Sequence, residues 1–162
     1  MTDIMAIEEY VERFQENPRL YLDRLLTTIE INKVEALYQR DNQPPIFRKQ
    51  FDELGLVTDF SINPQYHNIV PLPVTEFSDE DYQRLTSRMV GEDFSKLNED
   101  DIRFYEGLEL MLIIGRVEDL YLSRIPDDVF FNKRIFISKT YDEDGFPIAY
   151  QLNAHVKRMD NQ

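Results

Sequence analysis

Residues 98–123 constrain the fold of this chain more than any other segment. The segment opens with Asn98-Glu99-Asp100-Asp101, which is typical of a helix start because Asn caps the first turn and acids there interact favourably with the helix dipole. Its middle, residues 108–114, reads Leu-Glu-Leu-Met-Leu-Ile-Ile. A helix that is apolar almost all round must be covered on every side. The segment therefore predicts a central buried helix that ends near Ser123, before Pro126.

Four further helices are predicted from apolar spacing and capping residues. Thr2 caps the first, which carries apolar residues at helical spacing up to Phe14. Asn17-Pro18 starts the second, which runs to about Gln39. A short third helix follows Gln43-Pro44-Pro45 and ends at Gly55, and a fourth opens at Ser78 and ends near Val90.

The remaining segments have the patterns of strands and of an extended strap. Residues 57–62 alternate as one short strand, and prolines keep residues 62–77 extended, as a strap over the core. Residues 135–156 predict an antiparallel β-hairpin that turns at Asp144-Gly145, with the apolar face of its second strand beginning at Ile148. We find no internal repeat and no linker. The sequence predicts a single globular α+β domain over residues 1–162, predominantly helical with about five helices, a C-terminal antiparallel hairpin and one short additional strand.

One fragment resembles a known DNA-binding fold. Phe51-Asp52-Glu53-Leu54-Gly55-Leu56-Val57 resembles the end of a winged-helix recognition helix followed by its strand, with residues 22–39 as the partner helix. The resemblance implies a winged-helix-like packing unit within residues 22–62. A recognition helix that faces DNA carries basic side chains, and this one has only Arg48 and Lys49, so the resemblance implies packing without DNA binding.

Composition excludes several classes of function. The chain has no cysteine, which excludes disulfides, thiolate metal sites and cysteine nucleophiles. Its N-terminus lacks the basic and apolar segments of a secretion signal, and its longest apolar run, Leu110 to Ile114, is too short to cross a bilayer. We therefore expect a cytoplasmic protein without membrane association. The net charge of −13 argues against direct nucleic-acid binding.

Catalytic and metal-binding patterns are missing from the sequence. His67 and His155 are far apart and form no metal-binding pair. Residues 142–145, Asp-Glu-Asp-Gly, fit a hairpin turn better than a calcium loop. The carboxylates that could support acid–base catalysis, if burial raised their pKa, are Glu106, Glu109 and Glu118. We assign no catalytic, cofactor-binding or metal-binding residue and expect no cofactor and no enzymatic activity.

The excess of acids is concentrated in the middle of the chain. Residues 51–100 hold 11 acids against only three bases, Arg84, Arg88 and Lys96. Capping explains the acids that follow Ser78 and Asn98, but not the scarcity of bases. We expect this region to contact a partner through Glu76, Asp79, Glu80, Asp81, Glu92, Asp93, Glu99, Asp100 and Asp101.

These observations favour a non-enzymatic regulatory or inhibitory protein that binds a basic surface of a partner protein, such as a nucleic-acid-binding protein. In that case its carboxylates could mimic the phosphates of a nucleic acid, as in the small acidic inhibitors of phages and mobile elements. An assembly or secretion chaperone that masks an apolar segment of a client is the alternative, with Ile69 and Leu72 as client contacts. A carboxylate-dependent enzyme is the third hypothesis. A homodimer is compatible with each of them.

Overall fold

The fold is α+β and mainly helical, as the sequence predicts. The computed structural model describes residues 3–73, 77–89 and 98–153. Along the chain the elements are α1 (Asp3–Glu16), α2 (Pro18–Tyr38), β1 (Phe47–Phe51), β2 (Val57–Ile62), the 3-10 helix η1 (Pro64–Tyr66), α3 (Asp79–Met89), α4 (Glu99–Leu122), α5 (Asp127–Phe130), β3 (Ile137–Tyr141) and β4 (Pro147–Leu152). The strands form two separate antiparallel hairpins, β1–β2 and β3–β4.

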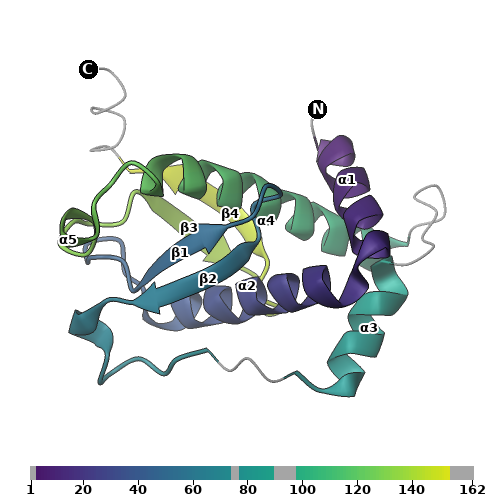
Figure 1. The fold of residues 1–162 in the computed structure, drawn as a ribbon, viewed down its shortest axis with the longest axis horizontal. Helices are drawn as coiled ribbons and strands as arrows, with labels where there is room; N and C mark the ends of the chain where they lie inside the picture. The colour runs from purple at the N-terminus through teal and green to yellow at the C-terminus, as the bar shows by residue number, and fades with distance from the viewer. Residues whose placement is uncertain (1–2, 74–76, 90–97, 154–162) are drawn as a thin grey trace.

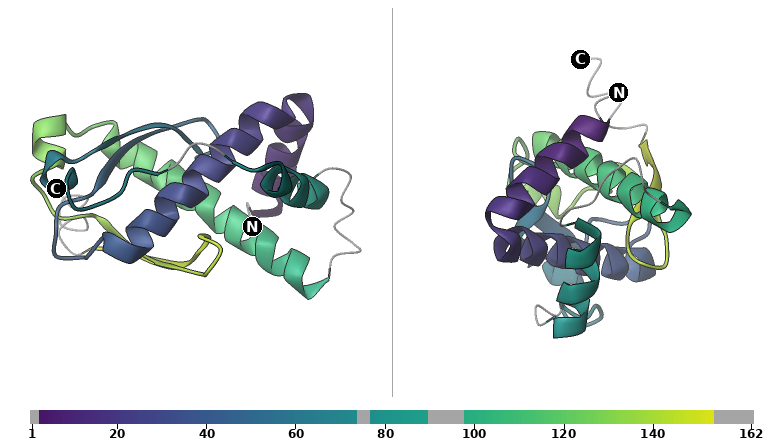
Figure 2. Two further views of the ribbon diagram at one scale, coloured as in Figure 1. Left: turned by 90° about the horizontal axis from the view of Figure 1, so that it is seen from below. Right: turned by 90° about the vertical axis from the view of Figure 1, so that its right-hand side faces the viewer.

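Helices α2 and α4 form the centre of the molecule. Both run from the end that carries α1 and α3 to the end that carries α5, and they cross each other in the view from below (Figures 1 and 2). Two of the predicted caps are present, since the side chain of Asn17 accepts from Leu20 N, and Asn98 and Asp101 form a capping box, while the predicted cap Thr2 lies outside the described residues. Within the described residues, no helix is long and apolar enough to cross a membrane.

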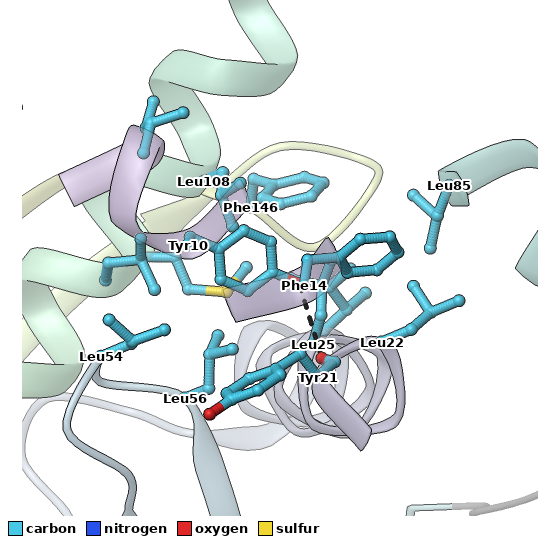
Figure 3. Close-up of a cluster of buried hydrophobic side chains, with 14 of the residues drawn as sticks. Tyr10, Phe14, Tyr21, Leu22, Leu25, Leu54, Leu56, Leu85, Leu108 and Phe146 are labelled. Atoms are coloured by element: carbon cyan, nitrogen blue, oxygen red, sulfur yellow. Dashed lines mark hydrogen bonds between the residues drawn. The ribbon is translucent and has the colours of Figure 1, made fainter. Parts of the chain in front are cut away.

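The larger core cluster lies where α1 packs across these two helices. Tyr10 and Phe14 of α1 are fully buried against Leu25 of α2 and Leu108 of α4 (Figure 3). The prediction that residues 108–114 are buried on every side holds in part, because Leu108, Met111, Leu112 and Ile114 are buried while Glu109, Leu110 and Ile113 are half-buried. Each fully buried side chain of this size contributes roughly 1.5–3 kcal/mol of hydrophobic stabilisation, so α1 is fixed mainly by these two aromatic residues.

The predicted third helix is wrong, because residues 47–62 form the β1–β2 hairpin instead. The Oδ1 atom of Asp52 accepts hydrogen bonds from the backbone N–H groups of Leu54 and Leu56, and Gly55 adopts a φ of 96°. Asp and Gly favour such a turn because the side chain replaces a backbone acceptor and glycine adopts positive φ without strain. The winged-helix resemblance is wrong for the same reason, since its recognition helix would occupy this hairpin.

The two hairpins repeat one another in sequence and in hydrogen bonding. Residues 49–55 read Lys-Gln-Phe-Asp-Glu-Leu-Gly, and residues 139–145, 90 positions later, read Lys-Thr-Tyr-Asp-Glu-Asp-Gly. Asp142 accepts from Asp144 N and Phe146 N, as Asp52 does from its own turn, and the β-bulge before each turn falls at equivalent positions. Each hairpin follows a pair of helices, α1–α2 or α3–α4. The chain therefore contains an internal repeat, contrary to the sequence analysis.

The two repeats pack reciprocally. The turn at Gly55 lies against Leu112 and Gly115 of α4, and the turn at Gly145 lies against Ile29 of α2. Asn32 of α2 strengthens the second contact, because its amide donates to the carbonyl of Gly145 at 2.9 Å. The turn of each repeat thus packs on the second helix of the other repeat. Such reciprocal contacts between equivalent elements mean that the two repeats are related by an approximate two-fold axis.

The segment after β2 matches the predicted strap in part. Val70 is buried, and the buried Tyr66 donates its hydroxyl to the carbonyl of Pro44 at 2.7 Å. A strap over the core is expected to bury Ile69, Val70, Leu72 and Val74. Ile69 and Leu72 are exposed, with 69% and 53% of their surfaces accessible, and Val74 lies outside the described residues. The strap is thus fixed at Tyr66 and Val70 and presents two apolar side chains to solvent.

Candidate functional site

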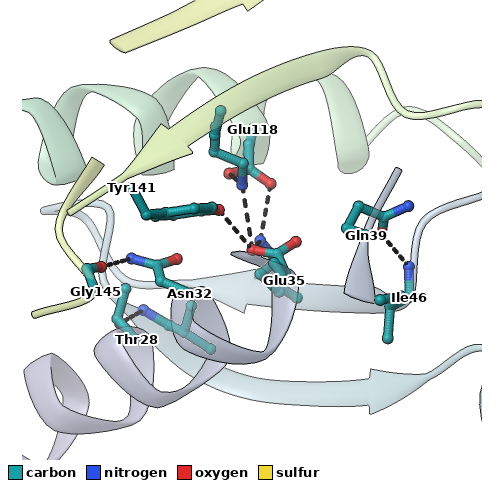
Figure 4. A network of polar contacts seen from close by, with 11 residues as sticks. Thr28, Asn32, Glu35, Gln39, Ile46, Glu118, Tyr141 and Gly145 are labelled. Atoms are coloured by element: carbon teal, nitrogen blue, oxygen red, sulfur yellow. Dashed lines mark hydrogen bonds and ion pairs between the residues drawn. The ribbon is translucent and has the colours of Figure 1, made fainter. Parts of the chain in front are cut away.

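Four charged side chains meet where the two repeats face each other. Glu35 of α2 and Glu118 of α4 each pair with both Lys49 of β1 and Lys139 of β3 (Figure 4). The Nζ–Oε distances are 3.0 and 3.1 Å for Lys49 and 3.4 and 2.7 Å for Lys139. Tyr141 also donates its hydroxyl to Glu35 at 3.1 Å. We call Glu35, Lys49, Glu118 and Lys139 the central quartet.

The central quartet is buried and formally neutral, and its members hold each other ionised. Burial alone would raise the pKa of the Glu118 carboxyl, but Lys139 and Lys49 outweigh burial and lower it to about 2. Burial would lower the pKa of Lys139, but Glu118 and Glu35 raise it well above its usual value. The pKa of Tyr141 is raised by burial and then by the charge of Glu35. None of these three groups is poised to exchange a proton near neutral pH.

We expect acid to destabilise the fold through Glu118. In the unfolded chain this carboxyl binds a proton near pH 4.5, whereas in the folded protein it does so only near pH 2. Between these values the unfolded state binds more protons, so the free energy of unfolding falls as the pH falls, by roughly 3 kcal/mol in total. Urea unfolding between pH 5 and pH 2, compared with Glu118→Gln, measures this. An equally steep decline in Glu118→Gln would contradict it.

A cavity of about 450 Å³ opens beside the central quartet, at the α5 end of the molecule. Its lining includes Glu35, Glu118 and Lys139, together with Tyr141. The two repeats contribute equivalent positions. Phe47 in β1 corresponds to Ile137 in β3, and Pro45, which precedes β1, corresponds to Ile135, which precedes β3. The cavity therefore lies between the repeats, on the same approximate axis as the central quartet.

The longer connection of the second repeat forms one wall of this cavity. Equivalent helix residues, such as Glu35 and Glu118, are 83 positions apart, whereas equivalent strand residues, such as Lys49 and Lys139, are 90 apart. The connection from α4 to β3 is therefore seven residues longer than the connection from α2 to β1. Arg48 holds this connection, because it donates to the carbonyls of Leu122 and Ile125, both at 2.8 Å, and pairs with Asp127. The whole connection between α4 and β3, residues 123–136, which we call the insertion, is thus an ordered part of the site.

The three carboxylates considered for catalysis lie in different surroundings. Glu106 is exposed and Glu109 is half-buried on α4. Glu118 alone lies in a large cavity, but its pKa is lowered, opposite to the raised pKa expected of a general acid. Among the described residues, no group of three or more carboxylates and histidines is placed to hold a metal ion. His67 is exposed, and His155 lies outside the described residues.

The predicted partner-contact residues divide between two helix starts. Asp79, Glu80 and Asp81 form the first turn of α3, and Glu99, Asp100 and Asp101 form the first turn of α4. Both turns lie at the end of the molecule opposite α5 (Figures 1 and 2). Glu76, Glu92 and Asp93 of the predicted set lie outside the described residues.

The acids of these two turns differ in exposure. Asp79, Glu80, Glu99 and Asp100 are exposed, while Asp81 and Asp101 are half-buried and serve in the caps with Ser78 and Asn98. Within the parts of the chain that the structure describes, no ion pair involves the four exposed acids. We call these four residues the acidic end.

Sequence reasoning missed the central quartet and the cavity. Glu118 was singled out as a carboxylate that burial could affect, but its partners were not, because a lysine in a strand is not a signal by itself and Glu35 looks like an ordinary helix residue. The signal that could have found them is the repeated pattern Lys-x-Phe/Tyr-Asp-Glu-x-Gly at residues 49–55 and 139–145. Comparisons with protein-family models, with curated proteins and with solved structures gave no match to this chain.

Proposed function

We propose that this protein is a non-enzymatic regulatory or inhibitory protein whose acidic end binds a basic surface of a partner protein. The observation that carries the proposal is that the first turns of α3 and α4 present Asp79, Glu80, Glu99 and Asp100 at one end of the molecule (Figure 2), exposed and without an ion pair to any other described residue. Unpaired charges of one sign at one end attract an oppositely charged surface and steer its approach. A nucleic-acid-binding protein is a partner with such a surface.

The acidic end can be tested by four isosteric substitutions. The variant Asp79→Asn/Glu80→Gln/Glu99→Gln/Asp100→Asn keeps the shape of both helix starts and removes four charges. Immobilised wild-type protein should retain a partner from a lysate of the native host and release it in a salt gradient, because screening acts over about 8 Å at physiological ionic strength. The variant should release the same partner at distinctly lower salt.

A matched variant controls for net charge. Asp59→Asn/Asp119→Asn/Asp128→Asn/Glu143→Gln removes the same number of charges from exposed positions away from the acidic end. We expect it to elute the partner like the wild type. Equal weakening by both variants would indicate a general charge effect, and elution independent of salt would contradict the proposal.

A chaperone or adaptor for an apolar client segment is the second candidate, supported by the exposure of Ile69 and Leu72 on the strap. Two neighbouring apolar side chains in solvent can form part of a protein contact. In the same experiment, a chaperone would retain a client that high salt does not release, and the double variant Ile69→Ala/Leu72→Ala would no longer retain that client. Retention of the partner by that double variant, together with release by salt, favours the acidic end.

A further inference from the structure

We propose that the cavity beside the central quartet binds a small molecule with an apolar body and an anionic head group of the carboxylate or phosphate type. Its volume, about 450 Å³, lies within the range of roughly 300–1,000 Å³ that is usual for small-molecule sites. This site is distinct from the acidic end, which lies at the opposite end of α4 (Figure 1).

The wall of the cavity is suited to an apolar body. Most of its lining residues are aliphatic, aromatic or proline and come from both repeats and the insertion, among them Ala36, Phe47, Leu122, Phe130, Ile135 and Ile137. Phe47, Leu122, Phe130 and Ile137 are buried, so this wall is built into the fold. Burial of a ligand's apolar surface against this wall favours binding.

The mouth of the cavity is suited to an anion. Arg124, Lys133 and Arg134, all exposed residues of the insertion, line it, against a single exposed acid, Asp41. None of these three cations takes part in an ion pair within the described chain, whereas the other basic residues near the cavity, Arg48 and Lys139, are paired. In a protein of net charge −13, a cavity with three unpaired cations at its mouth attracts anions locally.

The inner end of the cavity sets the orientation of the ligand. Glu35, Glu118 and Lys139 already satisfy one another there with Lys49, and the central quartet has no net charge. A third buried anion at this end would lose its hydration without gaining a free cation. The apolar body therefore enters first, and the head group stays at the mouth, where an arginine side chain can form bidentate hydrogen bonds with a carboxylate or phosphate.

Titration calorimetry with four ten-carbon probes tests the ligand class. Decanoate and monodecyl phosphate are expected to bind once per chain and saturably, and at least one of them roughly tenfold more tightly than decanol, because hydrogen bonds to a charged group are stronger than those to a neutral one. Decylammonium should bind more weakly than decanol. If decanol matches both anions, or if no probe saturates at one site, the proposal is overturned. Which anion binds more tightly identifies the head group.

Two variants locate the binding. Lys133→Glu/Arg134→Glu should weaken binding of the preferred anion at least about tenfold, and its control, Lys33→Glu/Arg103→Glu, makes the same change of charge at exposed positions outside the cavity. Ala36→Phe narrows the cavity from an exposed helix position and should abolish binding of anion and alcohol alike. Ala149→Phe on β4 is its matched control. Normal binding by Ala36→Phe would place the probe elsewhere and overturn the proposal.

Discussion

Replacing Lys49 by methionine is expected to lower the free energy of unfolding by about 3–5 kcal/mol. Lys49 pairs with both Glu35 and Glu118 at about 3 Å, and its side chain is only 3% exposed. Its loss leaves two buried carboxylates with Lys139 alone, and a buried charge without a partner is costly. Urea unfolding at pH 7, followed by circular dichroism, measures the change.

Two further variants show whether the central quartet causes that loss. Lys33→Met removes an exposed lysine from α2 and should change stability by less than about 0.5 kcal/mol. Lys49→Met/Glu35→Gln restores the balance of charge, since one carboxylate then faces one lysine, and should recover part of the lost stability. A Lys49→Met protein as stable as the wild type would mean that the four groups are not coupled.

Gly115→Ala is expected to lower the free energy of unfolding by more than about 3 kcal/mol, although alanine is the better helix former by about 1 kcal/mol. A Cβ at Gly115 would lie 1.8 Å from the carbonyl oxygen of Gly55, which is backbone and cannot rotate away. The hairpin turn and α4 must therefore separate. Overpacking of this kind costs more than the gain in propensity, and thermal and urea unfolding would both detect it.

The control for this prediction lies one turn further along the same helix. Asp119 is exposed on α4, so Asp119→Ala adds helix propensity without a steric conflict and should leave stability unchanged or slightly raised. Opposite signs for the two alanine variants would show that the close approach to Gly55 decides the result. A stabilised Gly115→Ala protein would contradict the packing of the β1–β2 turn against α4.

The sequence predicted the elements that depend on local signals. The Asn17-Pro18 and Asn98 caps located the starts of α2 and α4 because capping acts within one turn of helix. The Asp144-Gly145 pair located the turn of the β3–β4 hairpin for the same reason. The fold class followed from these elements, and the structure confirms it.

The first hairpin was missed because its spacing satisfies two periods. Phe47, Phe51 and Leu54 recur at helical spacing. In a strand, however, Phe47, Lys49 and Phe51 are two positions apart and lie on the same face. The choice depends on Asp52 and Gly55, which form the turn, and on Lys49, which is buried because Glu35 and Glu118 pair with it. Glu118 is 69 residues away along the chain, and such a contact leaves no trace in a local window.

The acidic end was predictable in part and the cavity was not. The acids at 79–81 and 99–101 follow capping residues and could be placed on helix starts from the sequence. The cavity needs the ends of α2 and α4, two strands and the insertion together. Only the comparison of residues 49–55 with 139–145 would have indicated that the chain has two similar halves with connections of unequal length.

The reciprocal packing of those halves has a consequence for how such a chain could arise. Each turn packs on a helix of the opposite half, and each lysine of the central quartet needs a glutamate from both halves. Two separate copies of an ancestral half-length polypeptide could have made the same contacts as a symmetric pair. In a single chain, one half can carry a connection seven residues longer than the other, which an exactly symmetric pair cannot, and here that connection lines the cavity of about 450 Å³ between the halves.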